Sequence, residues 1–331
     1  MEIKAAQVNE LRKMTGVGMM DCKNALVEAE GDFDKAVDIL RKKGQKVAAK
    51  RADRTADQGR VIAKVNANNT KGYILVLSCE TDFVGKNAEF VAASEQFINL
   101  AVKADAKTRD EVLALDVDGR TIADHIQDLM GKTGEKIELP AYNVIEAPYV
   151  TAYNHMGNRL ATIAGFNMTG VDETAHEVAL QIASMNPMAL SADSISDEVK
   201  ARELAVYIEK TKAEEIEKYV ENAIRKAGIN PAHVDSEDHI ESNTAKGWIT
   251  PEQAQQAREI KAAATAEATT NLEKQAKKIE MISQGRLNKF FKENTLLAQD
   301  YYGEGKMSVE EFMKKTNKDL TCTGFFRFQL G

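Results

Sequence analysis

The feature that most constrains the fold is a repeated unit, in which a β-hairpin leads through a loop into an amphipathic helix. Apolar runs at 61–65 and 73–77 flank a polar turn and predict the first hairpin. Runs at 149–153 and 160–164 predict the second hairpin in the same way. The repetition indicates two similar α+β halves, each with a small antiparallel sheet and helices.

The helix after each hairpin is expected to turn one apolar stripe toward its own sheet. The predicted stripes contain Phe90, Phe97 and Ala101 in the first copy, and Val178, Ile182 and Met185 in the second. Between the copies, Thr121 can cap a further helix, and alternating residues at 136–139 predict a third strand with Pro140 at a sheet edge. Residues 321–330 are expected to close the second sheet.

The N-terminal segment predicts three short helices with a limited core, a bundle of the ubiquitin-associated type. Asp32 can cap the third helix, and Gly44 is expected to end it. Met19 and Met20 stand at the start of the second helix. Their side chains either plug the bundle core, or one of them lies exposed, where a flexible thioether suits a partner's groove. Spacing leaves both alternatives open.

A long charged insertion interrupts the second half at 194–285. Apolar residues roughly a heptad apart predict a helix from Ser196 to Lys226. A capping box at 250–253, with proline at the first helical position, starts a second helix toward Gln284. The two helices are expected to pair as a long antiparallel coiled coil. The residues between them, 230–248, indicate no role.

These patterns divide the chain into six segments. The segment at 46–59 is basic and polar without an apolar period, which predicts a linker with Lys50 and Arg51 facing solvent. The six segments are the bundle at 1–45, the linker at 46–59, the first half at 60–145, the second half at 146–193 and 286–331, and the insertion at 194–285.

Composition argues against several classes of protein. A net charge of −7 disfavours nucleic acid or an anionic membrane as the main partner. The three cysteines, Cys22, Cys79 and Cys322, are far apart and lack a CxxC motif, which predicts reduced thiols and a cytoplasmic location. The first residues enter a helical pattern without a signal or transit segment, and no apolar run is long enough to span a membrane.

No catalytic or metal-binding constellation is visible. The five histidines lack metal-ligand spacing, and Cys79 has no neighbour in sequence that would activate it. Residues 131–133 spell Gly-Lys-Thr, but Ile126 stands where a phosphate-binding loop needs glycine. We therefore expect no cofactor and a protein that works by binding. An α+β enzyme whose site the sequence does not reveal is an alternative.

The loop at 79–86 is unusual because it carries an aromatic residue between a buried strand and a helix. Such loops are usually short and polar, yet Phe83 and Val84 lie between Asp82 and Gly85. Phe83 either folds back to seal the sheet edge or is presented to a partner, with Asp82 orienting the loop. Spacing alone does not decide between these alternatives.

Three blocks of the sequence resemble signatures of the elongation factor Ts family. Residues 11–26 resemble its N-terminal signature, 81–84 (Thr-Asp-Phe-Val) its TDFV motif, and 323–328 its closing strand. The blocks occur in order and span nearly the whole chain. The resemblance implies a guanine-nucleotide exchange factor that binds elongation factor Tu, both GDP-bound and nucleotide-free, and promotes GDP release by disturbing its Mg²⁺ and phosphate site.

The resemblance also implies roles for individual residues. The residues that would displace Mg²⁺ in the partner are Thr81, Asp82, Phe83 and Val84. The bundle would dock on the nucleotide-binding domain of elongation factor Tu through Arg12, Met19, Met20 and Lys23.

Two further contacts follow from the resemblance. Gly134 would touch the partner, and His155 would contact a second domain of it; Thr133 stands where the family pattern has an aliphatic residue. The resemblance is compatible with a dimer or with a heterotetramer formed with the partner. The alternative function is an adaptor or scaffold, in which the bundle binds a tail and exchange activity is absent.

Overall fold

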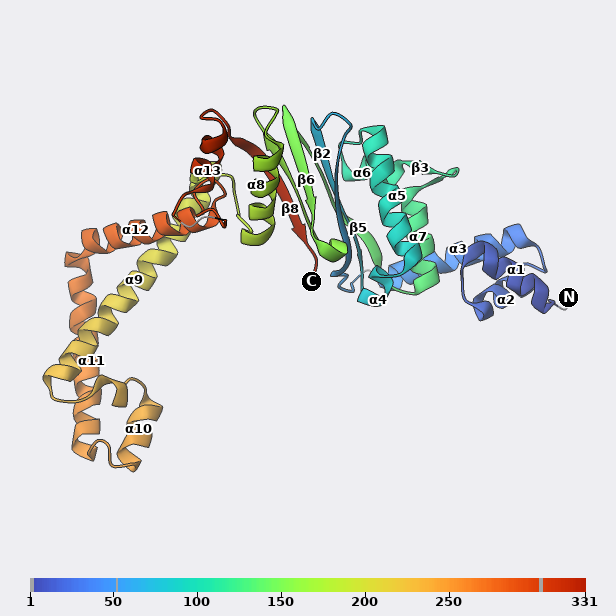
Figure 1. The fold of residues 1–331 in the computed structure, drawn as a ribbon. Coiled ribbons are helices and arrows are strands. Elements are labelled where there is room, and N and C mark those ends of the chain that lie inside the picture. Colours follow the sequence, from blue (N-terminus) through green and yellow to red (C-terminus); the bar gives the residue numbers. More distant parts are fainter. Residues whose placement is uncertain (1–2, 52, 304–305) are drawn as a thin grey trace. The chain divides into compact units, whose positions relative to one another are not determined.

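The computed structural model describes residues 3–51, 53–303 and 306–331; position 52 of the predicted linker lies outside them. The fold is α+β, as predicted, with small antiparallel sheets and many helices (Figure 1). Contacts divide the chain into unit 1, residues 1–190 and 299–331, and unit 2, residues 191–298. No described helix is both long enough and apolar enough to cross a membrane.

Unit 1 contains two three-stranded antiparallel sheets. The first has the order β1 (Gln58–Val65), β2 (Lys71–Cys79) and β5 (Ile137–Glu146). The second has the order β6 (Tyr149–Asn154), β7 (Leu160–Phe166) and β8 (Cys322–Gln329). Val61 pairs with Val76, and Ala152 pairs with Ile163, so both predicted hairpins are present.

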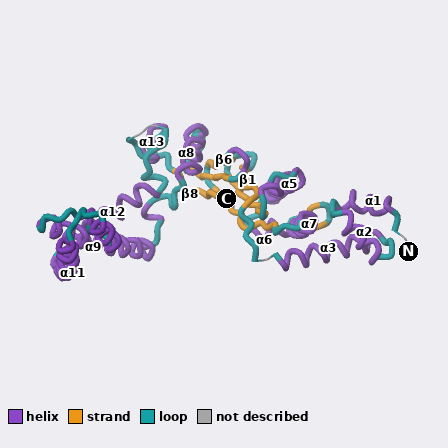
Figure 2. Tube along the Cα trace, turned by 90° about the horizontal axis from the view of Figure 1, so that it is seen from below, coloured by secondary structure: helices purple, strands orange, loops and turns teal. Residues whose placement is uncertain are grey.

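The two sheets pack face to face, with helices on their outer sides. Figure 2 shows the strands between α8 and α5. Strand β2 is buried on both faces, as predicted, because Ile74 and Val76 pack against the second sheet while Leu75 and Leu77 join the core under the helices. A Cβ atom at Gly72 would lie 2.6 Å from a methyl carbon of Val150, so the sheets approach closely there.

Pro140 lies in β5 at the edge of the first sheet, as predicted, since among the described strands β5 pairs with β2 alone. The register shifts between Val76 and Ser78, so that Leu139 and Pro140 lie opposite the single residue Leu77. This is a β-bulge, where the missing N–H of proline interrupts no ladder.

Helices α5 (Ala88–Ala104), α6 (Arg109–Ala114) and α7 (Ile122–Thr133) belong to the first half, and the short pair β3 (Asp116–Val117) and β4 (Arg120–Thr121) precedes α7. Thr121 caps α7 in a capping box with Asp124, as predicted for its start. The predicted stripe of Phe90, Phe97 and Ala101 is buried in α5.

In the second half, α8 (Asp172–Met185) covers the second sheet and α13 (Val309–Thr316) precedes β8. Val178 and Ile182 are fully buried, as predicted. The prediction was wrong for Met185, whose side chain is about half exposed. The helix ends there, because Asn186 adopts the left-handed conformation, so the apolar stripe stops short of Met185.

The bundle consists of α1 (Ala5–Thr15), α2 (Met19–Glu28) and α3 (Phe33–Lys50) around its own small core. Asp32 caps α3, accepting from the Lys35 N–H at 3.1 Å. The prediction that Gly44 ends this helix was wrong, because α3 continues to Lys50. Gly44 instead lies against α7, where a Cβ atom would meet the Gln127 carbonyl oxygen at 3.2 Å. The absence of a side chain at Gly44 therefore allows α3 to pack closely against α7.

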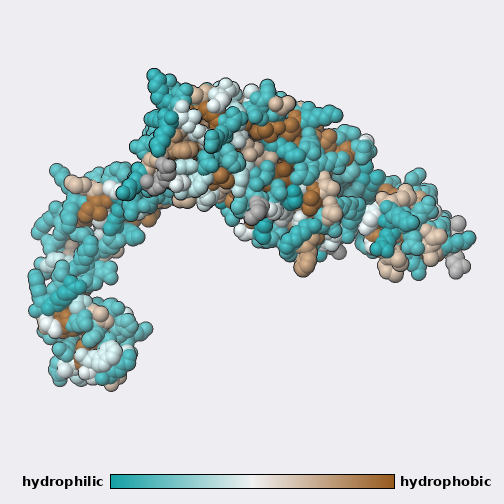
Figure 3. Space-filling view, in the orientation of Figure 1, coloured by the Kyte–Doolittle hydropathy of each residue, from teal (hydrophilic) through white to brown (hydrophobic). Residues whose placement is uncertain are grey.

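Unit 2 contains α9 (Asp197–Lys226), which packs along α11 (Pro251–Lys274) and α12 (Ala276–Asn294). The capping box at Thr250 is present. The second helix was predicted to run unbroken toward Gln284, but it breaks at Gln275, whose φ of −101° and ψ of 7° leave the helical range. The surface of these helices in Figure 3 is mostly hydrophilic.

The segment at 230–248, for which the sequence indicated no role, folds onto the end of α9 and α11. It contains the short helix η3 (Pro231–His233) and α10 (Glu237–Ala245). A separate core forms there from Ile224, Ile229, Val234, Ile240, Ile249, Ala254 and Ala257. The segment is thus a small packed subdomain of unit 2.

Candidate functional site

Phe83 is presented to solvent on a single-turn helix, α4 (Asp82–Gly85), which follows β2 directly. Its side chain is 84% exposed, so the alternative in which the ring seals the sheet edge is wrong. Thr81, in an extended conformation, caps the turn, since its hydroxyl accepts from the Val84 N–H at 3.5 Å. The extended cap and the helical turn together direct an aromatic side chain away from the sheet.

Glu135 ties the start of this turn to the end of α7. Its carboxylate accepts two hydrogen bonds from Thr81, one from the backbone N–H at 3.0 Å and one from the hydroxyl at 2.6 Å. Hydrogen bonds to a charged acceptor are stronger than neutral ones. Gly134, with φ of 70°, makes the left-handed turn that brings Glu135 back toward Thr81.

Glu80 anchors the same loop from the other side. Its carboxylate accepts from the guanidinium groups of Arg51 at 2.7 Å and Arg54 at 3.0 Å, and from the Lys136 N–H at 2.7 Å. Burial raises the pKa of Glu80, but these donors outweigh it and lower the pKa to about 2. The prediction that Arg51 faces solvent was wrong, since this side chain is only 28% exposed; the Lys50 side chain lies outside the described part.

The floor beneath α4 is closely packed backbone. A Cβ atom at the buried Gly85 would lie 3.2 Å from the N and Cα atoms of Gly59, whose own φ is 129°. Burial raises the pKa of the Cys79 thiol to about 12, and the thiol donates to the Thr81 carbonyl at 3.1 Å. Cys79 therefore has a structural role as a hydrogen-bond donor. Because Gly85 is packed against Gly59, α4 cannot move closer to the sheet.

The bundle exposes a second apolar surface. Met19 and Met20, at the start of α2, are 50% and 63% exposed, so the alternative in which they plug the core is wrong. Arg12 and Lys23 are exposed as well. Gly16 ends α1 in the left-handed conformation, which places the turn before Met19 at the surface.

Gly134 and His155 lie in different parts of unit 1. Gly134 is partly exposed and directly precedes Glu135, so it belongs to the neighbourhood of α4. Thr133 turns its hydroxyl back to the Leu129 carbonyl at 2.8 Å. His155 is exposed after β6, and its Nδ1 atom lies 2.8 Å from the Tyr153 hydroxyl. Gly134 thus adjoins residues 81–84 through Glu135, whereas His155 belongs to the turn between β6 and β7.

Sequence reasoning missed the residues that hold these surfaces. Glu135 is 54 positions from Thr81, and Glu80 is 29 positions from Arg51, so no local spacing connects them. Asn154 was missed too; its amide exchanges two hydrogen bonds with the backbone of Ala63, at 2.8 and 2.9 Å, and so ties the second hairpin to β1. The one sequence signal for Glu80 is its position directly before the Thr81–Val84 motif.

Within residues 3–51, 53–303 and 306–331, no group of three or more histidine, cysteine or acidic residues is arranged to hold a metal ion. The three cysteines are free and buried. What the described arrangement offers is a fixed aromatic side chain and exposed thioethers, which suit contact with another macromolecule.

Comparison with known proteins gives a consistent result. The family model for elongation factor TS matches residues 80–331. The chain is 50% identical to elongation factor Ts of Bacteroides fragilis over 331 residues, which covers all of this chain and 99% of that protein. It is 38% identical to the elongation factor Ts of Christiangramia forsetii over 332 residues, covering 100% and 99% of the two chains. The same protein of Flavobacterium psychrophilum is 38% identical over 331 residues, with 99% of each chain covered.

Proposed function

Because this chain belongs to the elongation factor Ts family, and so is a translation elongation factor, we propose that it binds elongation factor Tu carrying GDP and accelerates the release of GDP. The observation that carries the proposal is Phe83, which is 84% exposed on a turn held by Glu135 and Glu80. Exposing a large apolar side chain to water is unfavourable, so its exposure on a fixed turn suits binding to a partner that buries it.

The proposed mechanism acts on the metal and phosphate site of the partner. Bound GDP is held by backbone N–H groups at a helix start and by Mg²⁺ that bridges phosphate oxygens. Phe83 inserts between helices of the partner's nucleotide-binding domain, and Thr81 to Val84 shift the groups that hold Mg²⁺. The phosphate charge is then poorly neutralised, and GDP leaves faster.

Preorganisation of the loop supports this mechanism. Thr81 is already fixed by two hydrogen bonds to Glu135, and Gly85 is packed against Gly59. A loop that is ordered before binding loses little conformational entropy on binding. More of the interaction free energy is therefore available to distort the partner.

The other predicted contacts complete the proposal. Arg12, Met19, Met20 and Lys23 dock on the nucleotide-binding domain, and their exposure on the bundle supports this role. Gly134 contacts the partner beside Phe83. His155, exposed between β6 and β7, contacts a second domain of elongation factor Tu and braces the complex from the other half.

We propose the finer fold assignments on the same basis. A compact core around Leu11 and Leu26 supports a bundle of the ubiquitin-associated type. Packing of α9 along α11 and α12 supports an antiparallel coiled-coil insertion. A cytoplasmic location stays a prediction. A dimer, or a heterotetramer with elongation factor Tu, stays a prediction as well, and light scattering of this protein mixed with elongation factor Tu measures the mass of the complex.

The test is the release rate of fluorescent GDP from elongation factor Tu with and without this protein. Phe83→Ala should reduce the acceleration at least about tenfold, because a buried aromatic anchor typically contributes 2 kcal/mol or more. Met281→Ala is the matched control, since Met281 is also exposed, at 74%, but lies in unit 2. Unchanged acceleration by Phe83→Ala would contradict the role of Phe83, whereas a parent protein that binds elongation factor Tu without accelerating GDP release would support the adaptor alternative.

A further inference from the structure

We propose that Gly131 and Gly44 are positioning residues, which hold the exposed methionines of α2 at a set distance from Phe83. This inference rests on the proposed function, because it assigns both surfaces to one partner. It concerns a contact within unit 1, between α3 of the bundle and α7 of the first half.

The two glycines let α3 and α7 meet backbone to backbone. A Cβ atom at Gly44 would lie 3.2 Å from the Gln127 carbonyl oxygen and 3.5 Å from the Gly131 Cα atom. A Cβ atom at Gly131 would lie 3.4 Å from the Gly44 Cα atom. Both glycines lie inside helices, where glycine costs about 1 kcal/mol relative to alanine. The close approach gives a reason for that cost at Gly44, where a Cβ atom would be crowded against the Gln127 carbonyl oxygen.

The same turn of α7 reaches both surfaces. Lys132 runs beneath the end of α1, since a Cβ atom at Gly16 would lie 3.1 Å from the Lys132 Cε atom, and its ammonium group pairs with Glu89 of α5. Glu135, three residues later, holds Thr81. Residues 131–135 therefore connect the turn before Met19 to the turn that carries Phe83.

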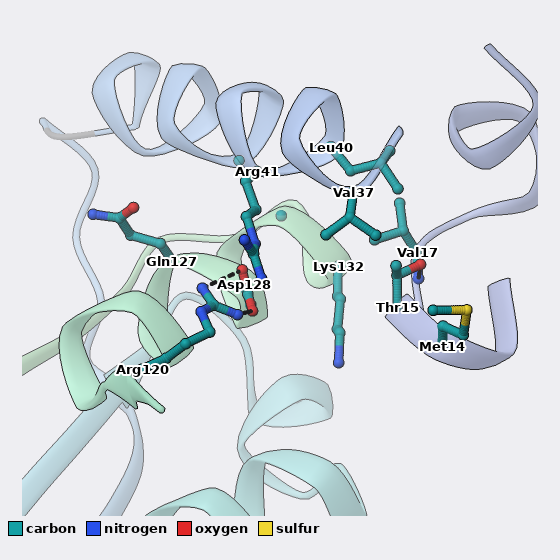
Figure 4. A pocket seen from close by; sticks show the side chains of 12 residues that line it. Met14, Thr15, Val17, Val37, Leu40, Arg41, Arg120, Gln127, Asp128 and Lys132 are labelled. Atoms are coloured by element: carbon teal, nitrogen blue, oxygen red, sulfur yellow. Dashed lines mark hydrogen bonds and ion pairs between the residues drawn. The ribbon is translucent and has the colours of Figure 1, made fainter. Parts of the chain in front are cut away.

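Beside the glycine contact, the joint between the bundle and the first half is not filled, in the described part of the chain, by a shared hydrophobic core. A cavity of about 240 Å³ lies beside it, lined by Val17, Val37 and Leu40 from the bundle and by Gln127 and Asp128 from α7 (Figure 4). Among the described residues, the hydrophobic clusters of the bundle and of the first half have no member in common. The glycine contact, where the backbones of α3 and α7 meet, is therefore expected to set the spacing between the two parts.

A fixed spacing has a thermodynamic consequence for binding. When two surfaces on one rigid body meet one partner, binding of the first makes the second intramolecular, and the gain is lost if the geometry is wrong. A side chain at position 131 that separates α3 from α7 should therefore remove the contribution of Met20, although Met20 itself is unchanged.

The experiment uses a graded pair of variants in the full chain. Gly131→Ala should behave as the parent, because its methyl group meets Gly44 at an ordinary contact distance. Gly131→Leu should force the helices apart, and Gly44→Ala is a milder variant should the leucine variant fail to fold. Gly285→Leu is the matched control, since Gly285 lies in α12 with nothing within 4 Å of its would-be Cβ atom.

The first measurement requires no partner. Spin labels at Val27→Cys and Lys86→Cys, both exposed positions in unit 1, report the distance between bundle and α4. We expect one narrow distribution for the parent, for Gly131→Ala and for Gly285→Leu, and a shifted or broadened one for Gly131→Leu. A parental distribution in Gly131→Leu would overturn the inference.

The second measurement is a double-mutant cycle on the affinity for elongation factor Tu. Met20→Ala should weaken binding several-fold in the parent and in Gly131→Ala, but less than twofold in Gly131→Leu. An undiminished effect of Met20→Ala in Gly131→Leu would contradict the positioning role. If the parent itself neither binds nor accelerates GDP release, the proposed function fails, while the label distances still decide whether the glycines set the spacing.

Discussion

At the scale of single residues, Glu80 is a charged group that holds the start of the loop in place. Arg51 and Arg54, from the segment before β1, and the Lys136 N–H converge on its carboxylate. Because the folded pKa of about 2 lies below the ordinary value of 4.5, ionised Glu80 stabilises the fold above about pH 4.5. That stabilisation is lost as pH falls from 4.5 toward 2.

We predict that Glu80→Gln lowers the free energy of unfolding at pH 7 by about 1–2 kcal/mol, allowing for solvent screening. The difference between parent and variant should shrink as pH falls from about 4.5 toward 2, because Glu80 then takes up a proton in the unfolded chain but not in the folded parent. Urea unfolding at several pH values measures it. Glu10→Gln, at an exposed helical position, serves as control. A difference that stays constant down to pH 3 would contradict the assigned linkage.

At the scale of elements, α4 is too short to be stable by itself, since four residues cannot offset the cost of starting a helix. Its conformation depends on Thr81 as cap and on Glu135 as the anchor of that cap. The element therefore depends on a residue from the far end of α7.

We predict that Glu135→Ala reduces the acceleration of GDP release about tenfold, or ~1.4 kcal/mol, although Phe83 is retained, because the released turn must be ordered again on binding. Lys86→Gln is the control. It breaks only the exposed pair of Lys86 with Asp82, 2.6 Å apart, and exposed pairs contribute little. Equal release rates for Glu135→Ala and the parent would show that the anchor is dispensable.

At the scale of the whole molecule, exchange is a coupling between two ligands of elongation factor Tu. If this protein weakens GDP binding by some factor, GDP must weaken binding of this protein by the same factor. We predict that Phe83→Ala reduces both factors equally, by about tenfold. Titrations of each ligand in the absence and presence of the other measure the two factors. If both factors are unchanged in Phe83→Ala, residues other than Phe83 must produce the coupling.

Much of the fold was predictable because its signals are local. The apolar runs at 61–65 and 73–77, the cap at Thr121 and the capping box at Thr250 depend on neighbours a few positions away, and each element is present. Errors arose where a local signal had a distant cause. Gly44 resembles a helix stop, but its missing side chain makes room for α7.

The candidate site was predictable in its motif and not in its support. The four residues Thr81 to Val84 were recognised through a resemblance, but spacing could not decide whether Phe83 points inward or outward. The structure places it outward because Gly85 packs on Gly59, and because Glu135 holds the cap. These partners are separated by tens of positions, and so no sequence period contains them.

The sequence by itself determined the α+β class, the two hairpins and the segments that resemble the family, because each depends on short-range periodicity or on a contiguous motif. Only the tertiary structure decided that Phe83, Met19 and Met20 are exposed, and that a glycine pair joins the bundle to the first half. Whether a side chain is exposed depends on which other residues pack against it, and these neighbours are brought together by contacts between residues far apart in the chain.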